Sequence, residues 1–107
     1  MAEIKAADIT AAEFKRRNQE PFPFYIIDVR EELEYQTFNL GGENIPLGSL
    51  LRNPEELDYM KDSEIIVICQ RGLRSETARR TLVKQGYTNV RNLAGGLLAW
   101  RKLDFKE

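Results

Sequence analysis

One segment, Ile65-Ile66-Val67-Ile68, constrains the fold more than any other part of this chain. All four residues are β-branched, which favours an extended strand. A short, continuous apolar run is typical of a strand in a parallel sheet that is covered by helices on both faces. Parallel neighbours need crossover connections, so strands and helices should alternate along the chain. We therefore expect an α/β fold with a mainly parallel central sheet and helices on both faces.

The rest of the chain supplies helices and strands for such a sheet. Thr10 and Glu13 have the spacing of a capping box at a helix start, and Asn53 with Pro54 is typical of a cap and first helical position. Gly86 is placed to end a helix. In chain order, the sequence predicts a helix over 10–18, a strand over 24–27, a short acidic helix over 31–37, a strand over 44–47, a helix over 54–60, the strand over 65–68, a helix over 74–85, a strand over 90–93 and a final helix after Gly95-Gly96.

Length and charge exclude several classes of protein. The 107 residues are 42% hydrophobic and 31% charged, which predicts one packed core and a single domain over 1–107. The net charge is −1, which argues against binding to the phosphate backbone of nucleic acid. No apolar run approaches the roughly 18 residues of a membrane helix, and the polar start lacks the apolar segment of a secretory signal. We expect a cytoplasmic protein with neither nucleic acid nor membrane as a partner.

The chain contains one cysteine, Cys69, and no histidine. A single cysteine excludes an internal disulfide, and the lack of histidine removes the commonest general base and the commonest nitrogen ligand of zinc. Hydrolases that pair serine or cysteine with histidine are therefore excluded, and we expect no metal and no other cofactor. What remains is chemistry that a cysteine performs with backbone N–H groups and arginines.

Polar residues follow two of the predicted strands, at the edge where functional groups collect in an open parallel sheet. Asp28 and Arg30 follow the first strand, and the central strand leads into Cys69-Gln70-Arg71-Gly72-Leu73-Arg74-Ser75. A tight loop between a buried strand and a helix lets N–H groups converge beside the cysteine and cradle an anion. With Arg71 and Arg74, these groups are expected to lower the thiol pKa and supply a thiolate nucleophile.

Six segments occur in the order and spacing of one known family. They are Ile27-Asp28-Val29-Arg30 with Glu31 and Glu34-Tyr35, Asn44-Ile45-Pro46-Leu47, the loop from Cys69 to Ser75, Ala78 with Leu82, Gly86-Tyr87-Thr88-Asn89-Val90, and Leu93-Ala94-Gly95-Gly96-Leu97-Leu98-Ala99-Trp100. On these segments, which cover nearly the whole chain, it resembles a single-domain rhodanese, the sulfurtransferase family. The resemblance implies a rhodanese-like fold with about five short strands. It also implies that Cys69 carries a persulfide, that Gln70 to Arg74 cradle it, and that Ser75 starts the next helix.

The implied function is transfer of sulfane sulfur. The Cys69 thiolate would attack the outer sulfur of thiosulfate or of a low-molecular-weight persulfide, release sulfite or a thiol, and pass sulfur from its persulfide to a thiophilic acceptor. Arg71 and Arg74 would hold the anionic donor, and the loop N–H groups would stabilise the persulfide charge. The partners are then this small anionic donor and, in addition, a protein that donates or accepts sulfur.

Two other functions stay open at this point. A cysteine phosphatase of the related fold uses the same kind of thiolate, but its signature has five residues between cysteine and arginine, whereas four separate Cys69 from Arg74. The second is a non-catalytic rhodanese-like interaction or sulfur-carrier module, against which the retained cysteine and intact loop both count.

One segment departs from the family pattern, and some polar residues have two interpretations. Members often have Gly-His-Ile-x-Gly-Ala where this chain has Phe38-Asn39-Leu40-Gly41-Gly42-Glu43. The Gly41-Gly42 version is similar to the rhodanese domain at the C-terminus of adenylylating sulfur-insertion enzymes, so the chain is either a free-standing relative or an excised domain. Asp28 and Arg30 either form a structural ion pair or shape the pocket. The acidic residues Glu31, Glu32 and Glu34 are interpreted as a solvated face.

Overall fold

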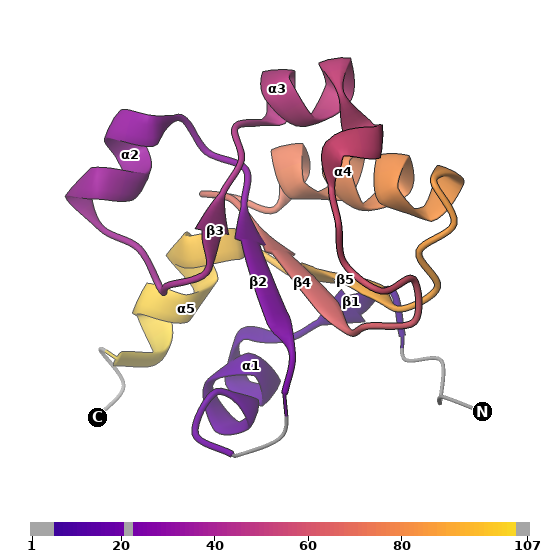
Figure 1. Ribbon diagram of the computed structural model, residues 1–107. Coiled ribbons are helices and arrows are strands. Elements are labelled where there is room, and N and C mark those ends of the chain that lie inside the picture. The colour runs from indigo at the N-terminus through magenta and orange to yellow at the C-terminus, as the bar shows by residue number, and fades with distance from the viewer. Residues whose placement is uncertain (1–5, 21–22, 105–107) are drawn as a thin grey trace.

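The computed structural model describes residues 6–20 and 23–104, and their centre is a wholly parallel sheet in the order β1-β5-β4-β2-β3 (Figure 1). The strands are β1 (Asp8–Ile9), β2 (Tyr25–Asp28), β3 (Glu43–Asn44), β4 (Ile65–Ile68) and β5 (Val90–Leu93). The helices are α1 (Ala11–Arg17), α2 (Glu32–Thr37), α3 (Leu47–Arg52), α4 (Leu73–Lys84) and α5 (Gly96–Asp104), with a 3₁₀ turn, η1 (Pro54–Glu56). The expected α/β fold with about five short strands is confirmed.

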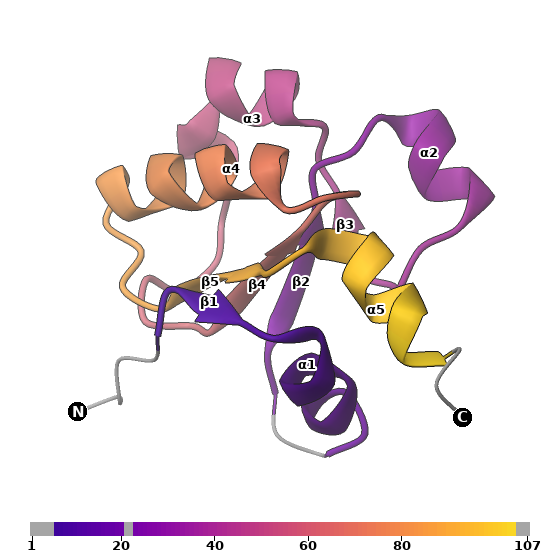
Figure 2. The same cartoon turned by 180° about the vertical axis from the view of Figure 1, so that it is seen from behind.

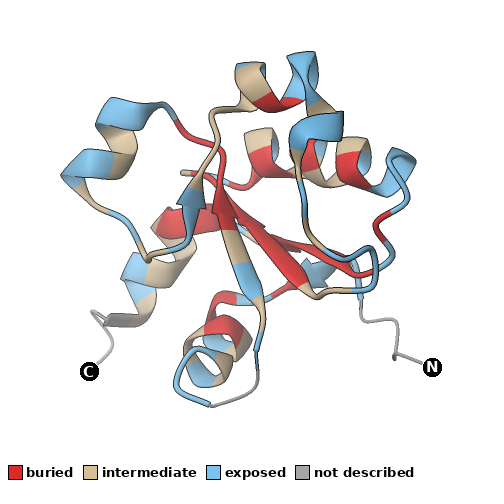
Figure 3. Ribbon diagram, in the orientation of Figure 1, coloured by how far each residue is buried: buried red, intermediate tan, exposed pale blue. Residues whose placement is uncertain are grey.

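Strand β4 is central and is buried on both faces, as its composition predicts. Helices α3 and α4 cover one face of the sheet, and α1 and α5 cover the other (Figures 1 and 2). The cluster on the α3–α4 side contains Ile27, Val29, Leu50, Ile65, Val67, Cys69, Ala78, Leu82, Tyr87 and Val90. The cluster on the α1–α5 side contains Ile9, Ala11, Phe14, Ile66, Ile68, Leu93 and Leu97. Burying each large aliphatic side chain contributes about 1.5–3 kcal/mol to the stability of the fold. The residues coloured red in Figure 3 are the buried ones, and they run along the central strands of the sheet.

Local signals place the ends of several helices correctly. The Thr10 side chain caps α1 by accepting a hydrogen bond from the Glu13 N–H at 3.0 Å. At the C-terminal side of α4, Gly86 has a φ of +100°, the left-handed conformation expected of a residue that ends a helix. Helix α4 begins at Leu73, so the expectation that Ser75 starts it is wrong by two residues.

The segment between β3 and β4 differs from the prediction. Strand β3 ends at Asn44 and a helix, α3, begins at Leu47, whereas the predicted helix over 54–60 is reduced to the single turn η1. Asn53 makes no side-chain capping bond there. The carbonyl of Leu57 accepts a hydrogen bond from the buried Tyr87 hydroxyl at 3.0 Å. This tertiary contact holds the segment against the core in place of the helical bond that local propensity favours.

Candidate active site

Cys69 follows β4 directly, and the chain after it turns back onto its sulfur. The residue is 1% exposed. Its Sγ accepts hydrogen bonds from the backbone N–H of Gly72 at 3.1 Å and of Ser75 at 3.3 Å, and it lies 3.2 Å from the Ser75 hydroxyl oxygen. The convergence of N–H groups expected from the sequence is therefore present.

Close backbone approach at two glycines makes this turn possible. Gly72 has a φ of +90°, and a Cβ there would lie 3.1 Å from the Gly95 nitrogen. A Cβ on Gly96 would lie 2.5 Å from the carbonyl oxygens of both Cys69 and Gln70. The N-terminus of α5 thus packs directly against the peptides of the Cys69 loop. The sequence places Gly95-Gly96 before a helix and within a family segment, but it did not predict this contact.

Helix α5 holds the loop through hydrogen bonds as well as packing. The Leu97 N–H donates to the Cys69 carbonyl at 3.0 Å, and the Leu98 N–H donates to the Gln70 carbonyl at 3.1 Å. These N–H groups belong to the first turn of a helix, where no intrahelical partner exists for them. The carbonyls of Cys69 and Gln70 therefore point toward α5, while the N–H groups of Gly72 and Ser75 face the sulfur.

The electrostatics at Cys69 favour the thiolate. Burial of the thiol opposes its ionisation, but hydrogen bonds from the Ser75 side chain and from the N–H groups of Ser75, Arg71 and Gly72 outweigh burial and lower the pKa of Cys69. Such bonds act because they stabilise the charged form of the sulfur more than the neutral form.

Arg74 and Glu34 form a two-pronged ion pair at the edge of the site. The guanidinium nitrogens Nη1 and Nη2 of Arg74 lie 2.9 and 3.1 Å from Oε1 and Oε2 of Glu34. The hydrogen bonds from Arg74 lower the pKa of Glu34 to about 2. Glu34 also accepts from the Glu31 N–H at 2.9 Å, completing a capping box on α2. The interpretation of Glu34 as part of a solvated acidic face is wrong, because α2 brings it across to α4.

Asp28 and Arg30 form a buried ion pair. Arg30 is 3% exposed, and its Nε and Nη2 lie 3.0 and 2.8 Å from the Asp28 carboxylate oxygens. Arg30 also donates to the carbonyls of Glu34 at 3.3 Å and Phe38 at 2.6 Å. This is the geometry of a structural ion pair. The pair holds the end of α2 and so places Glu34 opposite Arg74, and Arg30 also lines a hollow next to the Cys69 pocket.

The sulfur lies at the base of a small pocket. Its volume is about 260 Å³, and its lining comprises Glu34, Cys69, Gln70, Arg71, Leu73 and Arg74. An adjoining hollow of about 520 Å³ shares Glu34 and Gln70 with it and extends over Leu33, Phe38 and Arg101. Arg71 and Leu73 are exposed at the mouth. The structure thus brings together Cys69, Gln70, Arg71, Leu73 and Arg74, while Gly72 and Ser75 lie buried beneath them.

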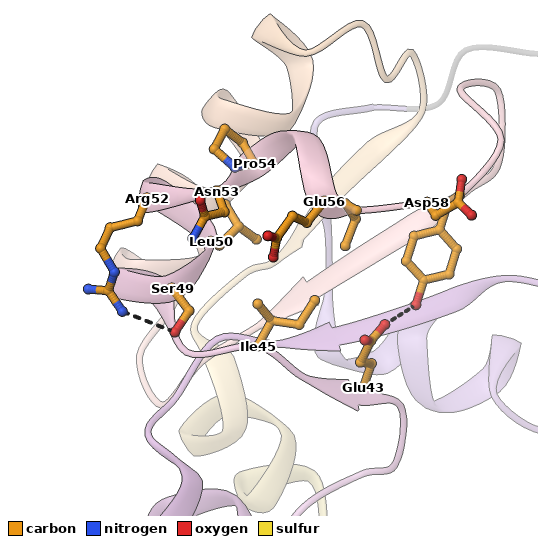
Figure 4. Close-up of a pocket in the computed structure, with 11 residues that line it drawn as sticks. Glu43, Ile45, Ser49, Leu50, Arg52, Asn53, Pro54, Glu56 and Asp58 are labelled. Atoms are coloured by element: carbon orange, nitrogen blue, oxygen red, sulfur yellow. Dashed lines mark hydrogen bonds between the residues drawn. The ribbon is translucent and has the colours of Figure 1, made fainter.

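A larger pocket of about 590 Å³ lies elsewhere, between β3, α3 and the segment that follows η1 (Figure 4). The Tyr59 hydroxyl donates to the Glu43 carboxylate at its edge at 2.6 Å, and burial with this contact raises the pKa of Tyr59. The lining includes Glu56 and Asp58 but no cysteine. This pocket was not predicted from the sequence.

Among the described residues there is neither a metal-ligand cluster nor a membrane-spanning helix. No group of three or more cysteine, aspartate or glutamate side chains is arranged to hold a metal ion within 6–20 and 23–104. In the same part of the chain, no helix is long and apolar enough to cross a membrane.

Comparison with known proteins identifies similar chains. The model of the family described as rhodanese-like domain matches residues 10–103. The putative sulfur carrier protein YrkF of Bacillus subtilis is 37% identical over 87% of this chain, which corresponds to 50% of YrkF. The putative sulfurtransferase YtwF of the same species is 35% identical over 92% of this chain and 91% of YtwF.

Larger proteins and a solved structure are also similar. The adenylyltransferase and sulfurtransferase MOCS3-1 of Zea mays is 30% identical over 90% of this chain and 22% of its own length. The crystal structure of a rhodanese-like domain protein from Staphylococcus aureus superposes with a TM-score of 0.76 at 27% identity, covering 89% of this chain and 91% of that one. The chain therefore spans half of YrkF and about a fifth of MOCS3-1. The expected resemblance to both single-domain proteins and adenylylating enzymes is confirmed.

Proposed function

Because the chain belongs to the rhodanese-like domain family, we propose that it is a sulfurtransferase in which Cys69 carries sulfane sulfur as a persulfide. The observation that supports this most directly is the position of the sulfur: Sγ accepts the Gly72 and Ser75 N–H bonds at the base of an open pocket. Relatives named as a putative sulfurtransferase and a putative sulfur carrier support the same assignment.

In the first half-reaction the Cys69 thiolate attacks the outer sulfur of thiosulfate. A bond forms between Sγ and that sulfur, the sulfur–sulfur bond of thiosulfate breaks, and sulfite leaves with the electron pair. With a low-molecular-weight persulfide as donor, a thiolate leaves in place of sulfite. The outer sulfur of the new persulfide carries the negative charge into the 260 Å³ pocket. N–H groups arranged before the reaction stabilise such a charge without reorganisation.

In the second half-reaction a nucleophilic acceptor attacks the outer sulfur, and the Cys69 thiolate leaves. The same cradle that stabilises the persulfide stabilises this leaving group. The acceptor approaches through the hollow that adjoins the pocket, where Leu33 is 75% exposed and Arg101 lies 4.5 Å from the centre of the Phe38 ring. An apolar side chain beside a cation suits an acceptor that carries both apolar and anionic groups, including a segment of another protein.

The two arginines have different roles in this proposal. Arg74 is held by Glu34, so its charge is partly neutralised and its position is fixed. Arg71 is exposed at the mouth of the pocket, where it can attract the anionic donor. A phosphatase is not favoured, because four residues separate Cys69 from Arg74 and the guanidinium of Arg74 is engaged by a carboxylate.

The test is to incubate the protein with thiosulfate and measure its intact mass. We expect a gain of one sulfur atom that disappears on adding cyanide, with thiocyanate appearing in solution. Cys69→Ser is the matched control, because serine has nearly the size of cysteine and leaves the chain without a thiol. A protein that gains no sulfur from thiosulfate or from a small persulfide would refute the proposal.

A further inference from the structure

Asn92 lies on β5 and bridges Gly72, in the middle of the Cys69 loop, and Ser75 at its end. It is 6% exposed. Its side-chain nitrogen Nδ2 donates to the Gly72 carbonyl at 3.1 Å, and its oxygen Oδ1 accepts from the Ser75 hydroxyl. The backbone N–H groups of Gly72 and Ser75 donate hydrogen bonds to the Cys69 sulfur. The Asn92 side chain therefore holds the two residues that donate these hydrogen bonds.

The chemistry of these contacts assigns the direction of each hydrogen bond. Only the NH₂ group of Asn92 can face the carbonyl of Gly72, so Oδ1 must face Ser75. An amide oxygen carries no hydrogen, so the Ser75 hydroxyl has to be the donor. A hydroxyl has a single proton, and toward Sγ, 3.2 Å away, Ser75 then presents a lone pair. In this arrangement the Cys69 thiol donates to Ser75, which donates to Asn92.

When the Cys69 thiol ionises, the Ser75 hydroxyl has to donate a hydrogen bond to the sulfur, where before it accepted one. A thiolate has no proton to donate, and a hydroxyl lone pair facing it is repulsive. The Ser75 hydroxyl must rotate to donate to Sγ, which leaves Asn92 Oδ1 without that bond. In the persulfide the charge lies on the outer sulfur, and Ser75 can donate to Asn92 again. The thiol proton passes to solvent, and Ser75 keeps its own proton throughout.

We propose that Asn92 is a positioning residue that competes with the Cys69 sulfur for the Ser75 hydroxyl proton. This competition makes the Cys69 thiolate less stable, and it ends when Cys69 carries sulfur as a persulfide. The persulfide part of this inference rests on the proposed function, whereas the competition for the proton does not.

Other charged groups around Cys69 are already paired or lie at the mouth. Arg74 on α4 is paired with Glu34 on α2, and both line the pocket together with the exposed Arg71. On β2, beside β4, Asp28 is paired with Arg30. None of these is changed by substitution of Asn92, so a shift in thiol ionisation in an Asn92 variant reports on Ser75 and the loop.

The test is the rate of iodoacetamide alkylation of Cys69 as a function of pH. Asn92→Leu keeps the shape of the side chain but removes its acceptor, so Ser75 is free to donate to the thiolate. We expect the midpoint to fall by about one pH unit, the size of effect produced by one hydrogen bond to a charged group. Asn92→Ala is a second variant with the same expected direction and no added bulk.

Two controls separate this effect from a loosened loop. Asn89→Leu makes the same substitution at a buried asparagine next to the opposite end of β5 and should leave the midpoint unchanged. In a protein that already carries Ser75→Ala, adding Asn92→Leu should leave the alkylation midpoint unchanged, because the Ser75 hydroxyl proton is gone. A merely structural Asn92 would raise the midpoint, since a loosened loop loses its N–H bonds to sulfur. A midpoint that rises or stays constant in Asn92→Leu and Asn92→Ala overturns the proposal.

Sulfur loading is measured separately by intact mass. If the alkylation results hold while the wild-type protein takes up no sulfur, the proton competition stands and the proposed function fails. If the protein loads sulfur but the midpoint does not fall in the Asn92 variants, the proposed function stands and the role of Asn92 is wrong.

Discussion

Replacing Gly96 with alanine places a methyl group against the backbone that carries Cys69. The φ of Gly96 is +62°, and the added Cβ would lie 2.5 Å from the carbonyl oxygens of Cys69 and Gln70. Ordinary contact begins at 3.4 Å, so the two segments must separate by nearly an ångström. Backbone atoms cannot swing aside as a side chain can. The N-terminus of α5 and the Cys69 loop must therefore move apart.

The cost has two parts. A left-handed conformation costs an alanine about 1–2 kcal/mol relative to glycine. The separation also stretches the bonds from Leu97 N–H to the Cys69 carbonyl and from Leu98 N–H to the Gln70 carbonyl, now 3.0 and 3.1 Å, beyond hydrogen-bonding distance. Each is worth about 1 kcal/mol. We expect Gly96→Ala to lower the free energy of unfolding by about 3–4 kcal/mol.

Gly41 offers a matched control. Its φ is +94°, and a Cβ there would meet nothing within 4 Å. Gly41→Ala therefore carries the conformational cost alone, about 1–2 kcal/mol. Urea denaturation of both variants measures the difference. Under conditions where Gly96→Ala is still folded, its rate of sulfur loading from thiosulfate should fall by about 10²-fold, because the loop is displaced by nearly an ångström.

Equal destabilisation by the two substitutions would refute this reasoning, because the contact with the Cys69 loop would then add nothing to the conformational cost. Normal sulfur loading in a destabilised Gly96→Ala protein would refute the functional half alone.

Three further substitutions test the surroundings of the site. Glu34→Gln breaks the ion pair with Arg74 and should lower the free energy of unfolding by about 0.5–1 kcal/mol after solvent screening. The pKa of Glu34 is lowered from 4.5 to about 2. The difference from wild type in urea denaturation should therefore be constant above pH 4.5 and vanish as the pH falls through about 2. Arg71→Ala should raise the KM for thiosulfate with little change in kcat, and the increase should shrink at high salt, which screens exposed charges; a KM that is the same as wild type at low salt would remove Arg71 from donor binding. Asp28→Asn leaves the Arg30 charge buried without its carboxylate and should cost about 3–5 kcal/mol in urea denaturation; a loss below about 1 kcal/mol would mean that the pair behaves like an exposed one.

The sequence alone determined the centre of the fold and the position of the cysteine that we propose as the nucleophile. Ile65 to Ile68 form the central strand because a run of β-branched apolar residues is stable only when covered on both faces. The loop after it follows from local constraints as well. A cysteine at the end of a buried strand, with Gly72 four positions into the turn and a helix-forming run beyond it, leads the backbone N–H groups back to the sulfur.

The partners of the site residues depend on contacts between distant parts of the chain. Glu34 lies 40 residues before Arg74, and its own surroundings in the sequence are those of an exposed acidic helix. Asn92 follows Ser75 by 17 residues and faces it only because β5 lies beside β4 under α4. Neither pairing leaves a periodic or local signal that could be recognised in the sequence.

Tertiary contacts also override local sequence preferences at two places. Asn53-Pro54 is a good helix start, yet the core contact between Tyr87 and the Leu57 carbonyl leaves only one turn there. Gly96 reads as a helix break, yet its lack of a side chain is needed for contact with the Cys69 loop. Periodicity and propensity report which residues are buried and how the backbone bends. They do not indicate which atoms come into contact when the helices pack on the sheet, and in this protein such contacts hold the Cys69 loop in place.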